Sequence, residues 1–386
     1  MKKILFIGMA ATGEDRYAWS GTCFQAYTSL KKMGFEVHYL SALQNAKNSF
    51  MEKLLYTYWA KIYSIMHKNV RLDESFYTVK LFSDTLKSYD YTPYDIIFIP
   101  TYLAAVCALP KRTKPQVIHL VDATVDSLFN YYSEFSNLTW HNRIEASFLG
   151  KKAFKRSDLL IASSEWCKQN AIKQYHIIPD KISVIEFGAN IDQSDIPAQP
   201  KSLNNKKHLN IYWSGVNWLR KGGDIAVSCC EELIKSGYLV TLNITGIKEL
   251  PKEHLNKDFI KNHGFLNKNK KNEYQKLISI MKEQDIFLFP SKAECSSIAI
   301  CEANGFGLPC FVYDTGGTKN YITNGENGYM LPLESSGKEF AHKIISCIKS
   351  HELEKLSYGA VKQYTEKLNW NVWGEKVKQK IETLND

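Results

Sequence analysis

The sequence predicts an α/β protein of two doubly wound, Rossmann-like domains that face a central cleft. Three observations lead to this prediction. Short apolar runs alternate with helical stretches along the first half of the chain, the alternation lapses in a polar segment with two prolines, and it then starts again. Such runs, without polar alternation, are typical of parallel strands buried on both faces. A length of 386 residues suits two domains of ordinary size.

The first domain is predicted to span residues 1–190. A helix is expected at 22–32, where apolar side chains recur before Gly34. The runs that we interpret as strands are short and mostly apolar, and several are rich in β-branched residues. They lie at 4–7, 36–40, 96–99, 116–120, 159–163 and 182–185.

A linker is predicted at 191–207, because this segment is polar, holds two prolines and has no periodicity. The second domain is predicted at 208–369, with helices such as 224–236 and 338–348 between and after its strands. Trp370 and Trp373 are expected to anchor a last helix, 370–386, which packs back on the first domain. The strands of the second domain are predicted at 209–214, 240–244, 286–289 and 310–313.

Composition excludes several classes of protein. The chain is 44% hydrophobic and 23% charged, which argues against a disordered chain, a collagen-like fibre and a coiled coil. No apolar run approaches the roughly 18 residues of a membrane span. The amino-terminal run at 4–8 resembles the core of a signal peptide but is short and lacks a cleavage site, so we interpret it as a first buried strand.

Cysteine usage and charge indicate the compartment and the class of partner. The nine cysteines form no C-x-x-C pair and no zinc spacing, so neither a disulfide framework nor a structural metal is predicted, and a cytoplasmic location is expected. The net charge of +9 suits anionic partners such as nucleotides, acidic lipid headgroups or polyphosphate. The lysines are spread along the whole chain, and no nucleic acid partner is predicted.

The segment 289–303, FPSKAECSSIAICEA, combines two carboxylates with the start of a helix. A strand ends at Pro290 and a helix is expected to begin near Ser296 or Ser297, where backbone N–H groups and the helix dipole favour an anion. Carboxylates on either side, Glu294 and Glu302, suit hydrogen bonds from sugar hydroxyls. The alternative is an ordinary helix start with two solvated glutamates.

The segment 215–224, GVNWLRKGGD, follows the predicted strand that ends at Ser214. Arg220 and Lys221, bounded by Gly215 and Gly222, offer a fork of donors and a point charge to a diphosphate. The alternative is a basic surface turn. In the first half, Gly21 opens a helix after the first strand and allows a phosphate to approach the backbone. Neither G-x-G-x-x-G nor G-x-x-x-x-G-K-[ST] occurs.

Together these motifs resemble the retaining glycosyltransferases of glycosyltransferase family four, which have the GT-B fold. The resemblance continues through Gly307-Leu308-Pro309, the Thr-Gly-Gly at 315–317 and the segment 324–329, and upstream through 163–166 and 179–192. The motif at 19–22 is similar to a first-domain loop of a bacterial subgroup. The resemblance is loose in identity but covers nearly the whole chain.

The resemblance implies a role for each candidate residue. Glu294 would hold the transferred sugar and Glu302 the ribose, while Arg220 and Lys221 would neutralise the leaving diphosphate. The remaining implied site residues bind the donor or lie near the reacting carbon: Gly21, Gly215, Leu266 at the base pocket, Ser296, Ser297, Ile298 and, on the first-domain side, Asp122.

Three departures from the family pattern leave the catalytic roles less defined than the fold. Val216 stands where many relatives have Arg, and Cys295-Ser296 replaces a frequent Gly-Phe. Asp122 stands near the position of a common His, whereas His119 is expected inside a strand.

The implied function is transfer of a sugar, with retention, from a nucleotide-diphosphate donor, UDP or GDP, to a saccharide, lipid-linked or protein-linked acceptor in bacterial surface glycan synthesis. No D-x-D motif occurs, so metal-independent catalysis without a cofactor is expected. A non-catalytic nucleotide-sugar or polyanion binder and a GT-B epimerase or phosphorylase remain as alternatives.

The segment 50–68 has apolar residues at helical spacing with lysines elsewhere. Such a helix can lie on an anionic membrane, which would place the enzyme at the inner face of the membrane. The alternative is a helix that packs on the first sheet or lines the acceptor cleft. His176 is expected on a surface loop, and Cys229 and Cys230 in a buried helix.

Overall fold

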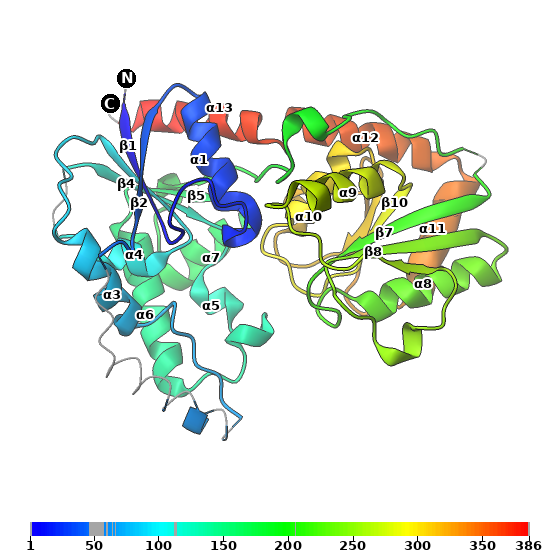
Figure 1. The fold of residues 1–386 in the computed structure, drawn as a ribbon, viewed down its shortest axis with the longest axis horizontal. Coiled ribbons are helices and arrows are strands. Elements are labelled where there is room, and N and C mark those ends of the chain that lie inside the picture. Colours follow the sequence, from blue (N-terminus) through cyan, green and yellow to red (C-terminus); the bar gives the residue numbers. More distant parts are fainter. Residues whose placement is uncertain are drawn as a thin grey trace. The chain divides into compact units, whose positions relative to one another are not determined.

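The computed structural model of the chain describes residues 2–45, 58, 61–63, 65, 67–111, 114–204 and 206–384. The chain forms two compact units. Unit 1 comprises Met1–Ile185 and Gly374–Asp386, and unit 2 comprises Glu186–Trp373. Each unit contains one twisted parallel sheet with helices on both faces (Figure 1). The predicted fold class is confirmed in this respect.

The sheet of unit 1 has six parallel strands in the order β2-β1-β3-β4-β5-β6 within the described residues. The order reverses direction between β1 and β3, as in other doubly wound sheets. Nearly every residue of β1, β3, β4 and β5 is buried, which explains why these strands appear in the sequence as continuous apolar runs. The strands are β1 (Lys3–Gly8), β2 (Glu36–Ser41), β3 (Ile96–Pro100), β4 (Gln116–Val121), β5 (Leu159–Ala162) and β6 (Ile182–Val184).

Helices cover both faces of this sheet. On one face Leu5 and Ile7 of β1 pack with Phe82 and Leu149 in the largest core of unit 1. On the other face the ring of Phe6 meets that of Tyr27 edge-on at 5.5 Å. The helices of the main part of unit 1 are α1 (Thr22–Lys32), α3 (Phe76–Leu86), α4 (Leu103–Ala108), α5 (Val125–Leu128), α6 (Trp140–Arg156) and α7 (Glu165–Tyr175).

The sheet of unit 2 repeats this plan, with six described parallel strands in the order β12-β11-β10-β7-β8-β9. The sequence did not indicate β9, which has three residues, or β12, which begins at a glycine and has two half-exposed side chains. The strands are β7 (His208–Ser214), β8 (Leu239–Thr245), β9 (Ile260–Asn262), β10 (Ile286–Phe289), β11 (Cys310–Tyr313) and β12 (Gly328–Leu331).

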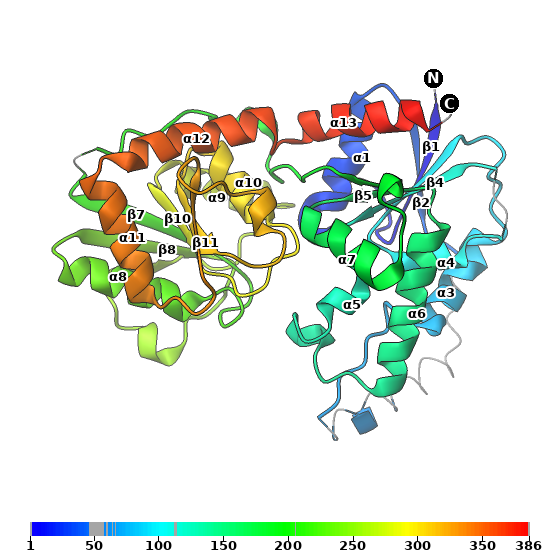
Figure 2. The same cartoon turned by 180° about the vertical axis from the view of Figure 1, so that it is seen from behind.

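Alternate residues of the unit 2 strands enter two separate cores. Ile211 and Leu288 pack with α8 and α11 on one face, whereas Tyr212 and Phe289 pack with α9 and α10 on the other. Both views of the ribbon show these helix pairs on opposite sides of the sheet (Figure 2). The helices are α8 (Gly223–Lys235), α9 (Lys271–Lys282), α10 (Ile298–Gly305), α11 (Gly337–Lys349), α12 (Glu352–Glu366) and α13 (Trp370–Thr383), which continues into unit 1.

The predicted domain boundaries need one correction. The first stretch of unit 1 ends at Ile185, not at residue 190, and the segment 191–207 belongs to unit 2. The reason is burial of its few apolar side chains: Ile191 and Ile196 enter one core of unit 2 and Leu203 enters the other. The prolines and polar residues around them conceal these contacts in the sequence.

The last helix has its own partners in each unit. Trp370 and Trp373, which belong to unit 2, are buried as predicted, and their ring centroids lie 5.0 Å apart. Trp370 Nε1 donates to Asn190 Oδ1 at 2.9 Å. Within unit 1, a Cβ at Gly374 would lie 2.4 Å from Ser29 Oγ, so the glycine allows α13 to approach the side chains of α1 closely.

The structure also bears on the predictions made for single residues and for the segment 50–68. Cys229 and Cys230 are buried in α8, and His176 is exposed at the end of α7, as predicted. All nine cysteines are free and buried. Most of the segment 50–68 lies outside the described residues. Within the described ranges, none of the helices has the length and apolar character of a bilayer span.

Candidate active site

The loop between β7 and α8 holds the predicted Gly215, Arg220 and Lys221. It is tightly folded: Arg220 N donates to Asn217 Oδ1 at 2.9 Å, and Gly215 N donates to Thr245 O on the neighbouring strand at 3.0 Å. Gly222, at the start of α8, has φ 70°, and a Cβ there would lie 2.1 Å from Pro290 O. A glycine is therefore required where this loop meets the next one.

The loop between β10 and α10 carries the predicted Glu294 and lies against the first loop. Lys292 N donates to Arg220 O at 2.8 Å. The loop after β11 adds a second support, since Gly317 N donates to Glu294 O at 2.9 Å and Thr315 Oγ1 donates to Lys292 O at 3.0 Å. Three loops from the adjacent strands β7, β10 and β11 are thus joined at the carboxyl end of the sheet, where doubly wound sheets bind ligands.

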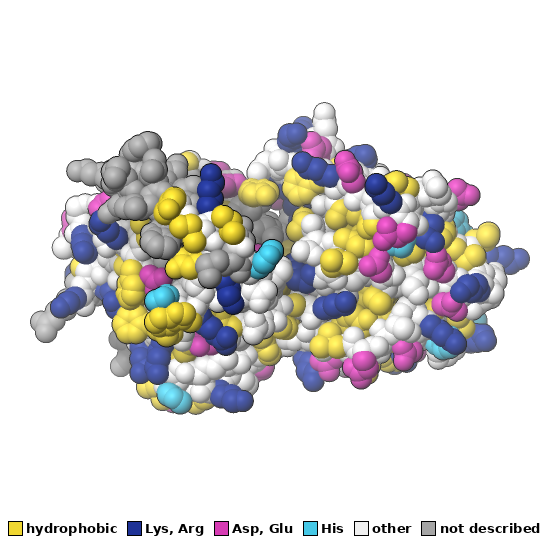
Figure 3. All heavy atoms as spheres, turned by 90° about the horizontal axis from the view of Figure 1, so that it is seen from below, with side chains coloured by type: hydrophobic (Ala, Val, Ile, Leu, Met, Phe, Trp, Pro, Cys, Tyr) yellow, Lys and Arg dark blue, Asp and Glu magenta, His cyan; other side chains and the backbone are white. Residues whose placement is uncertain are grey.

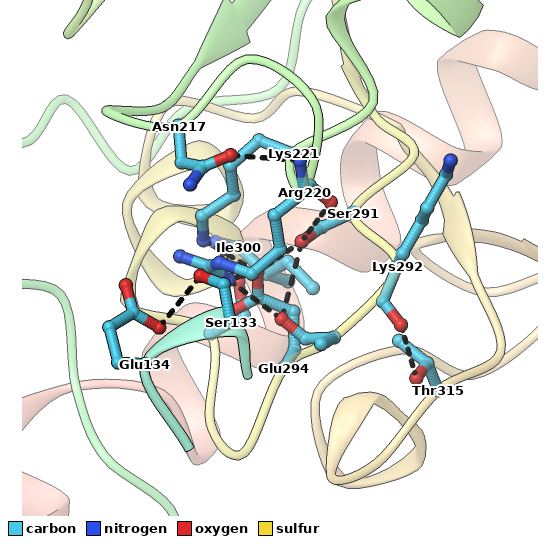
Figure 4. A network of polar contacts seen from close by, with 12 residues as sticks. Ser133, Glu134, Asn217, Arg220, Lys221, Ser291, Lys292, Glu294, Ile300 and Thr315 are labelled. Atoms are coloured by element: carbon cyan, nitrogen blue, oxygen red, sulfur yellow. Dashed lines mark hydrogen bonds and ion pairs between the residues drawn. The ribbon is translucent and has the colours of Figure 1, made fainter. Parts of the chain in front are cut away.

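The side chains of Arg220, Lys221 and Glu294 meet at the junction of these loops (Figure 4). Lys221 Nζ lies 2.5 Å from Glu294 Oε1 and Arg220 Nη1 lies 3.5 Å from it. Ser291 Oγ donates to the same oxygen at 2.5 Å. Arg220 Nη1 also donates to Ala293 O at 2.8 Å. Two cations and one carboxylate leave an excess of positive charge, which suits an anionic ligand.

This cluster is largely withdrawn from solvent. The side chains of Glu294, Lys221 and Arg220 are 5%, 14% and 20% exposed. Burial lowers the pKa of Lys221, Glu294 raises it, and the charge of Arg220 lowers it further. The ammonium also lies 4.6 Å from the centroid of the Phe289 ring. Because charges interact more strongly away from water, a diphosphate at this point would gain more than at an exposed lysine.

The amino-terminal end of α10 provides the predicted Ser296, Ser297 and Ile298. Ser297 is the N-cap, and its hydroxyl accepts from Ile300 N at 3.4 Å, which confirms the expected helix start. Ile298 is the first residue of the helix. The positive end of the α10 dipole therefore lies at the same sheet edge as the basic pair.

Glu302 lies further along α10 and is nearly buried, at 9% exposure. Its Oε1 pairs with Nζ of Lys268, which also donates to Asn190 O at 3.3 Å. Leu266, two residues before this lysine, packs partly buried against the core that contains Phe289 and Ile300. The sequence did not single out Lys268, because one lysine in a loop among 49 basic residues has no distinguishing pattern.

A line of hydroxyl groups at the ends of β7 and β8 was also missed. Tyr212 OH lies 2.7 Å from Thr245 Oγ1, which donates to Ser214 Oγ at 3.3 Å. Burial raises the pKa of Tyr212 to about 12, and the charge of Glu302 adds to the rise. The alternation of Tyr212 and Ser214 on β7, with Thr245 opposite Ser214 on β8, is the one pattern that could have indicated these groups.

The two predicted residues of unit 1 lie in segments that follow a strand, Gly21 between β1 and α1 and Asp122 after β4. Gly21 has φ 90° and begins α1, after two residues, Trp19 and Ser20, that also have positive φ. Asp122 follows β4 directly, and its charge contributes to the raised pKa of the buried Cys167. His119 is fully buried within β4 and its ring packs edge-on against Phe154 at 5.7 Å.

One group of described side chains has metal-ligand geometry, although the sequence predicts no metal. Asp224, Glu253 and His254 have ligand atoms within 4.8 Å of one another, and both carboxylate residues are exposed. Hydrogen bonds account for much of this arrangement, because Asp224 Oδ1 lies 2.9 Å from His254 Nε2 and accepts from Trp218 Nε1 at 2.7 Å. These three residues are not among those that surround Glu294.

Comparison with known families matches both halves of the chain. Residues 23–193 match the model "Glycosyltransferase Family 4", and residues 196–363 match the model "Glycosyl transferases group 1". CapJ of Staphylococcus aureus is 24% identical over 235 residues, which are 59% of this chain and 56% of CapJ. The chain spans about half the length, or less, of the first curated relatives that it matches.

Solved structures extend the likeness to the whole fold. Sucrose-phosphate synthase from Thermosynechococcus elongatus superposes with a TM-score of 0.68 at 14% identity, covering 100% of this chain and 99% of that one. HepE of Anabaena in complex with UDP-glucose gives a TM-score of 0.63 at 15% identity, covering 99% and 100%. At these identities the likeness establishes the fold.

Proposed function

Since the chain belongs to the group 1 glycosyltransferases of GT-B fold, we propose that it transfers a sugar from a UDP or GDP donor to a glycan or lipid-linked or protein-linked acceptor, with retention of the anomeric configuration. The single observation that carries this proposal is the convergence of Arg220 and Lys221 on Glu294 at the carboxyl end of the sheet. UDP-glucose binding by the similarly folded HepE supports a UDP donor.

Breaking the bond between the anomeric carbon and oxygen leaves negative charge on the diphosphate and positive charge on the sugar ring. We assign the stabilisation of the diphosphate to Arg220, Lys221 and the start of α10, a contribution worth about 3–4 kcal/mol for each well-placed donor in comparable sites. Glu294 orients the sugar and favours the positive charge of the ring. The departing phosphate takes the acceptor's proton, so that the reaction needs neither a protein nucleophile nor a metal.

Glu302 is proposed to accept hydrogen bonds from the ribose, with Leu266 against the base. Gly215 and the Ser296–Ser297–Ile298 backbone are proposed to surround the phosphates. Gly21 is proposed to let a donor phosphate approach the backbone, and Asp122 to act near the reacting carbon. The reaction is proposed to occur in the cytoplasm, at the inner face of the membrane when the acceptor is lipid-linked, in the synthesis of a bacterial surface glycan.

Thermal shift against UDP-, GDP-, ADP- and CMP-sugars identifies the donor. A donor at about 100 times its Kd should stabilise the protein by about 2.7 kcal/mol. With that donor, release of nucleoside diphosphate should depend on an added acceptor, and the product linkage should keep the donor's anomeric configuration.

The two alternative functions predict other results. A binding protein would be stabilised by the nucleotide sugar but would release no diphosphate. An epimerase would convert the donor without an acceptor, and a phosphorylase would need inorganic phosphate.

A further inference from the structure

The outer face of α6 exposes an apolar stripe that a water-facing helix would normally lack. The inner face of this helix places Ala146, Leu149 and Ala153 in the core, each 0% exposed. On the outer face Trp140, Ile144 and Phe148 recur every fourth residue and are 66%, 60% and 54% exposed. Side chains four residues apart lie above one another on a helix, so these three form one continuous stripe.

The stripe extends onto the start of α3. The ring of Phe76, which is 53% exposed, lies 5.9 Å from the ring of Phe148. The two helices are joined here, since Phe76 N donates to Glu145 Oε1 at 2.5 Å. Three half-exposed aromatic rings and an isoleucine present on the order of 300–500 Å² of apolar surface, as large as the largest patch on a typical monomer. Patches of this size often have a function.

Basic side chains outnumber acidic ones on the helix that carries this stripe. Within α6 the one acidic side chain, Glu145, is bonded to the backbone of α3. The five basic residues of the same helix are Arg143, Lys151, Lys152, Lys155 and Arg156. On α3, Lys80 is exposed one turn after Phe76. On the face of unit 1 shown in Figure 3, hydrophobic side chains lie among Lys and Arg side chains.

We propose that this surface, formed by Trp140, Ile144, Phe148 and Phe76 with the lysines of α6, docks on an anionic lipid bilayer. Helices that lie in the membrane interface typically combine an aromatic and aliphatic face with lysines beside it. In such helices the rings lie near the acyl chains and the ammonium groups lie at the headgroups. Trp is also enriched at the interface between membrane and water. The excess of one charge sign favours lipid over a protein partner, whose interface would be depleted of lysine.

This surface is separate from the residues assigned to catalysis. All its residues belong to unit 1, and it contains neither Gly21 nor Asp122. It goes beyond the proposed transfer reaction by assigning membrane contact to a defined surface, and membrane binding can be measured without donor or acceptor. Failure of one proposal would therefore leave the other standing.

The test is sedimentation of the full chain with vesicles of phosphatidylcholine alone and of equal parts phosphatidylcholine and phosphatidylglycerol. The protein should bind the second kind and not the first, and salt should release it. A combined Trp140→Ser, Ile144→Ser, Phe148→Ser variant should lose at least about tenfold in partition coefficient. Replacing Lys151, Lys152 and Lys155 by Gln should cost about fivefold for each lysine.

A matched control changes three equally exposed apolar side chains elsewhere. Ile178, Leu255 and Tyr358 are 69%, 60% and 63% exposed, and their replacement by Ser should leave vesicle binding unchanged. Should the triple α6 variant fold poorly, the single change Ile144→Asp tests the same surface at an exposed position.

Three results would overturn the proposal: no binding of the natural chain to anionic vesicles, equal binding by the α6 variants, or a self-association that those variants abolish while vesicle binding persists.

Discussion

Lys221 Nζ lies 2.5 Å from Glu294 Oε1, so two of the residues proposed for catalysis neutralise each other within one unit of the protein. Ser291 Oγ, at 2.5 Å from the same oxygen, and Arg220 Nη1, at 3.5 Å, complete the group. A bound diphosphate would share the two cations with this carboxylate. The group therefore links two loops, and it is also the proposed binding site of the anion.

The pair Lys221–Glu294 predicts different effects on stability and on activity. Lys221→Met removes one partner of a buried carboxylate and should destabilise unit 2 by about 3 kcal/mol. The double change Lys221→Met with Glu294→Gln removes both charges and should recover much of that stability, yet remain inactive. Urea unfolding and donor turnover of the two single variants and the double variant measure this. Lys319→Met, which removes the exposed partner of Asp314, is the control. Recovery of activity in the double variant would contradict the assignment.

The two glutamates should fail in different kinetic constants. Glu302→Gln should act mainly on donor affinity and raise KM, because hydrogen bonds to the ribose serve the ground state and the transition state alike. Glu294→Gln should lower kcat, because the charge of the sugar ring develops only in the transition state. Steady-state kinetics with the identified donor separates the two. The opposite pattern would exchange their roles, and two unaffected enzymes would reduce the motif to a helix start.

Gly222 offers a test of how the two loops are held together. Gly222→Ala incurs both a positive φ and a clash with Pro290 O, whereas Gly237→Ala incurs only the positive φ, since nothing lies within 4 Å of its Cβ position. The first variant should be less stable than the second by about 1–3 kcal/mol and should also lose donor binding. Thermal unfolding and donor titration check this. Equal stability would mean that the loop yields to the added methyl group.

His119 predicts how stability depends on pH. Burial lowers its pKa from 6.5 to about 4. Between these values the unfolded chain binds a proton that the folded chain does not. The contribution of His119 to stability is therefore complete above pH 6.5 and declines as the pH falls toward 4, by about 3 kcal/mol in all.

The measurement is urea unfolding at pH 7 and pH 5. His119→Phe should reduce the loss of stability between these pH values by about 2 kcal/mol, whereas His342→Phe, on an exposed helical position, should not change it. An unchanged pH dependence in His119→Phe would show that the buried imidazole is not the group responsible.

The buried cysteines predict slow thiol chemistry. All nine are free and buried, and burial raises the pKa of Cys310, for example, above the range in which thiolate forms. The folded protein should react with a thiol reagent such as DTNB only as fast as it opens, and the denatured protein should show nine thiols. Rapid labelling of the folded chain would contradict this.

The sequence predicted those features of the fold that neighbouring residues determine, and it missed those that depend on contacts between distant parts of the chain. Strands such as β3 and β10 are buried along their whole length, so their apolar runs reveal them. The helix start at Ser297 has a local capping signal. The burial of Ile196 and Leu203 depends on surfaces far away in the chain, so the segment 191–207 resembled a linker.

The same distinction applies to the candidate site. The sequence motifs at 215–224 and 289–303 indicated Arg220, Lys221 and Glu294. The contact of Lys268 with Glu302 joins residues 34 positions apart, and the contact of Tyr212 with Thr245 depends on the pairing of β7 with β8. Such partners become visible only when the fold sets the register.

Acceptor-dependent release of nucleoside diphosphate, compared between the natural chain and the Arg220→Gln, Lys221→Met variant, tests the central claim most directly. The natural chain should release diphosphate only when donor and acceptor are both present. The variant should fold but release it more slowly by a factor of about 10⁴ or more, since each lost contact costs about 100-fold. Release at the natural rate by the folded variant would contradict the assignment of this site.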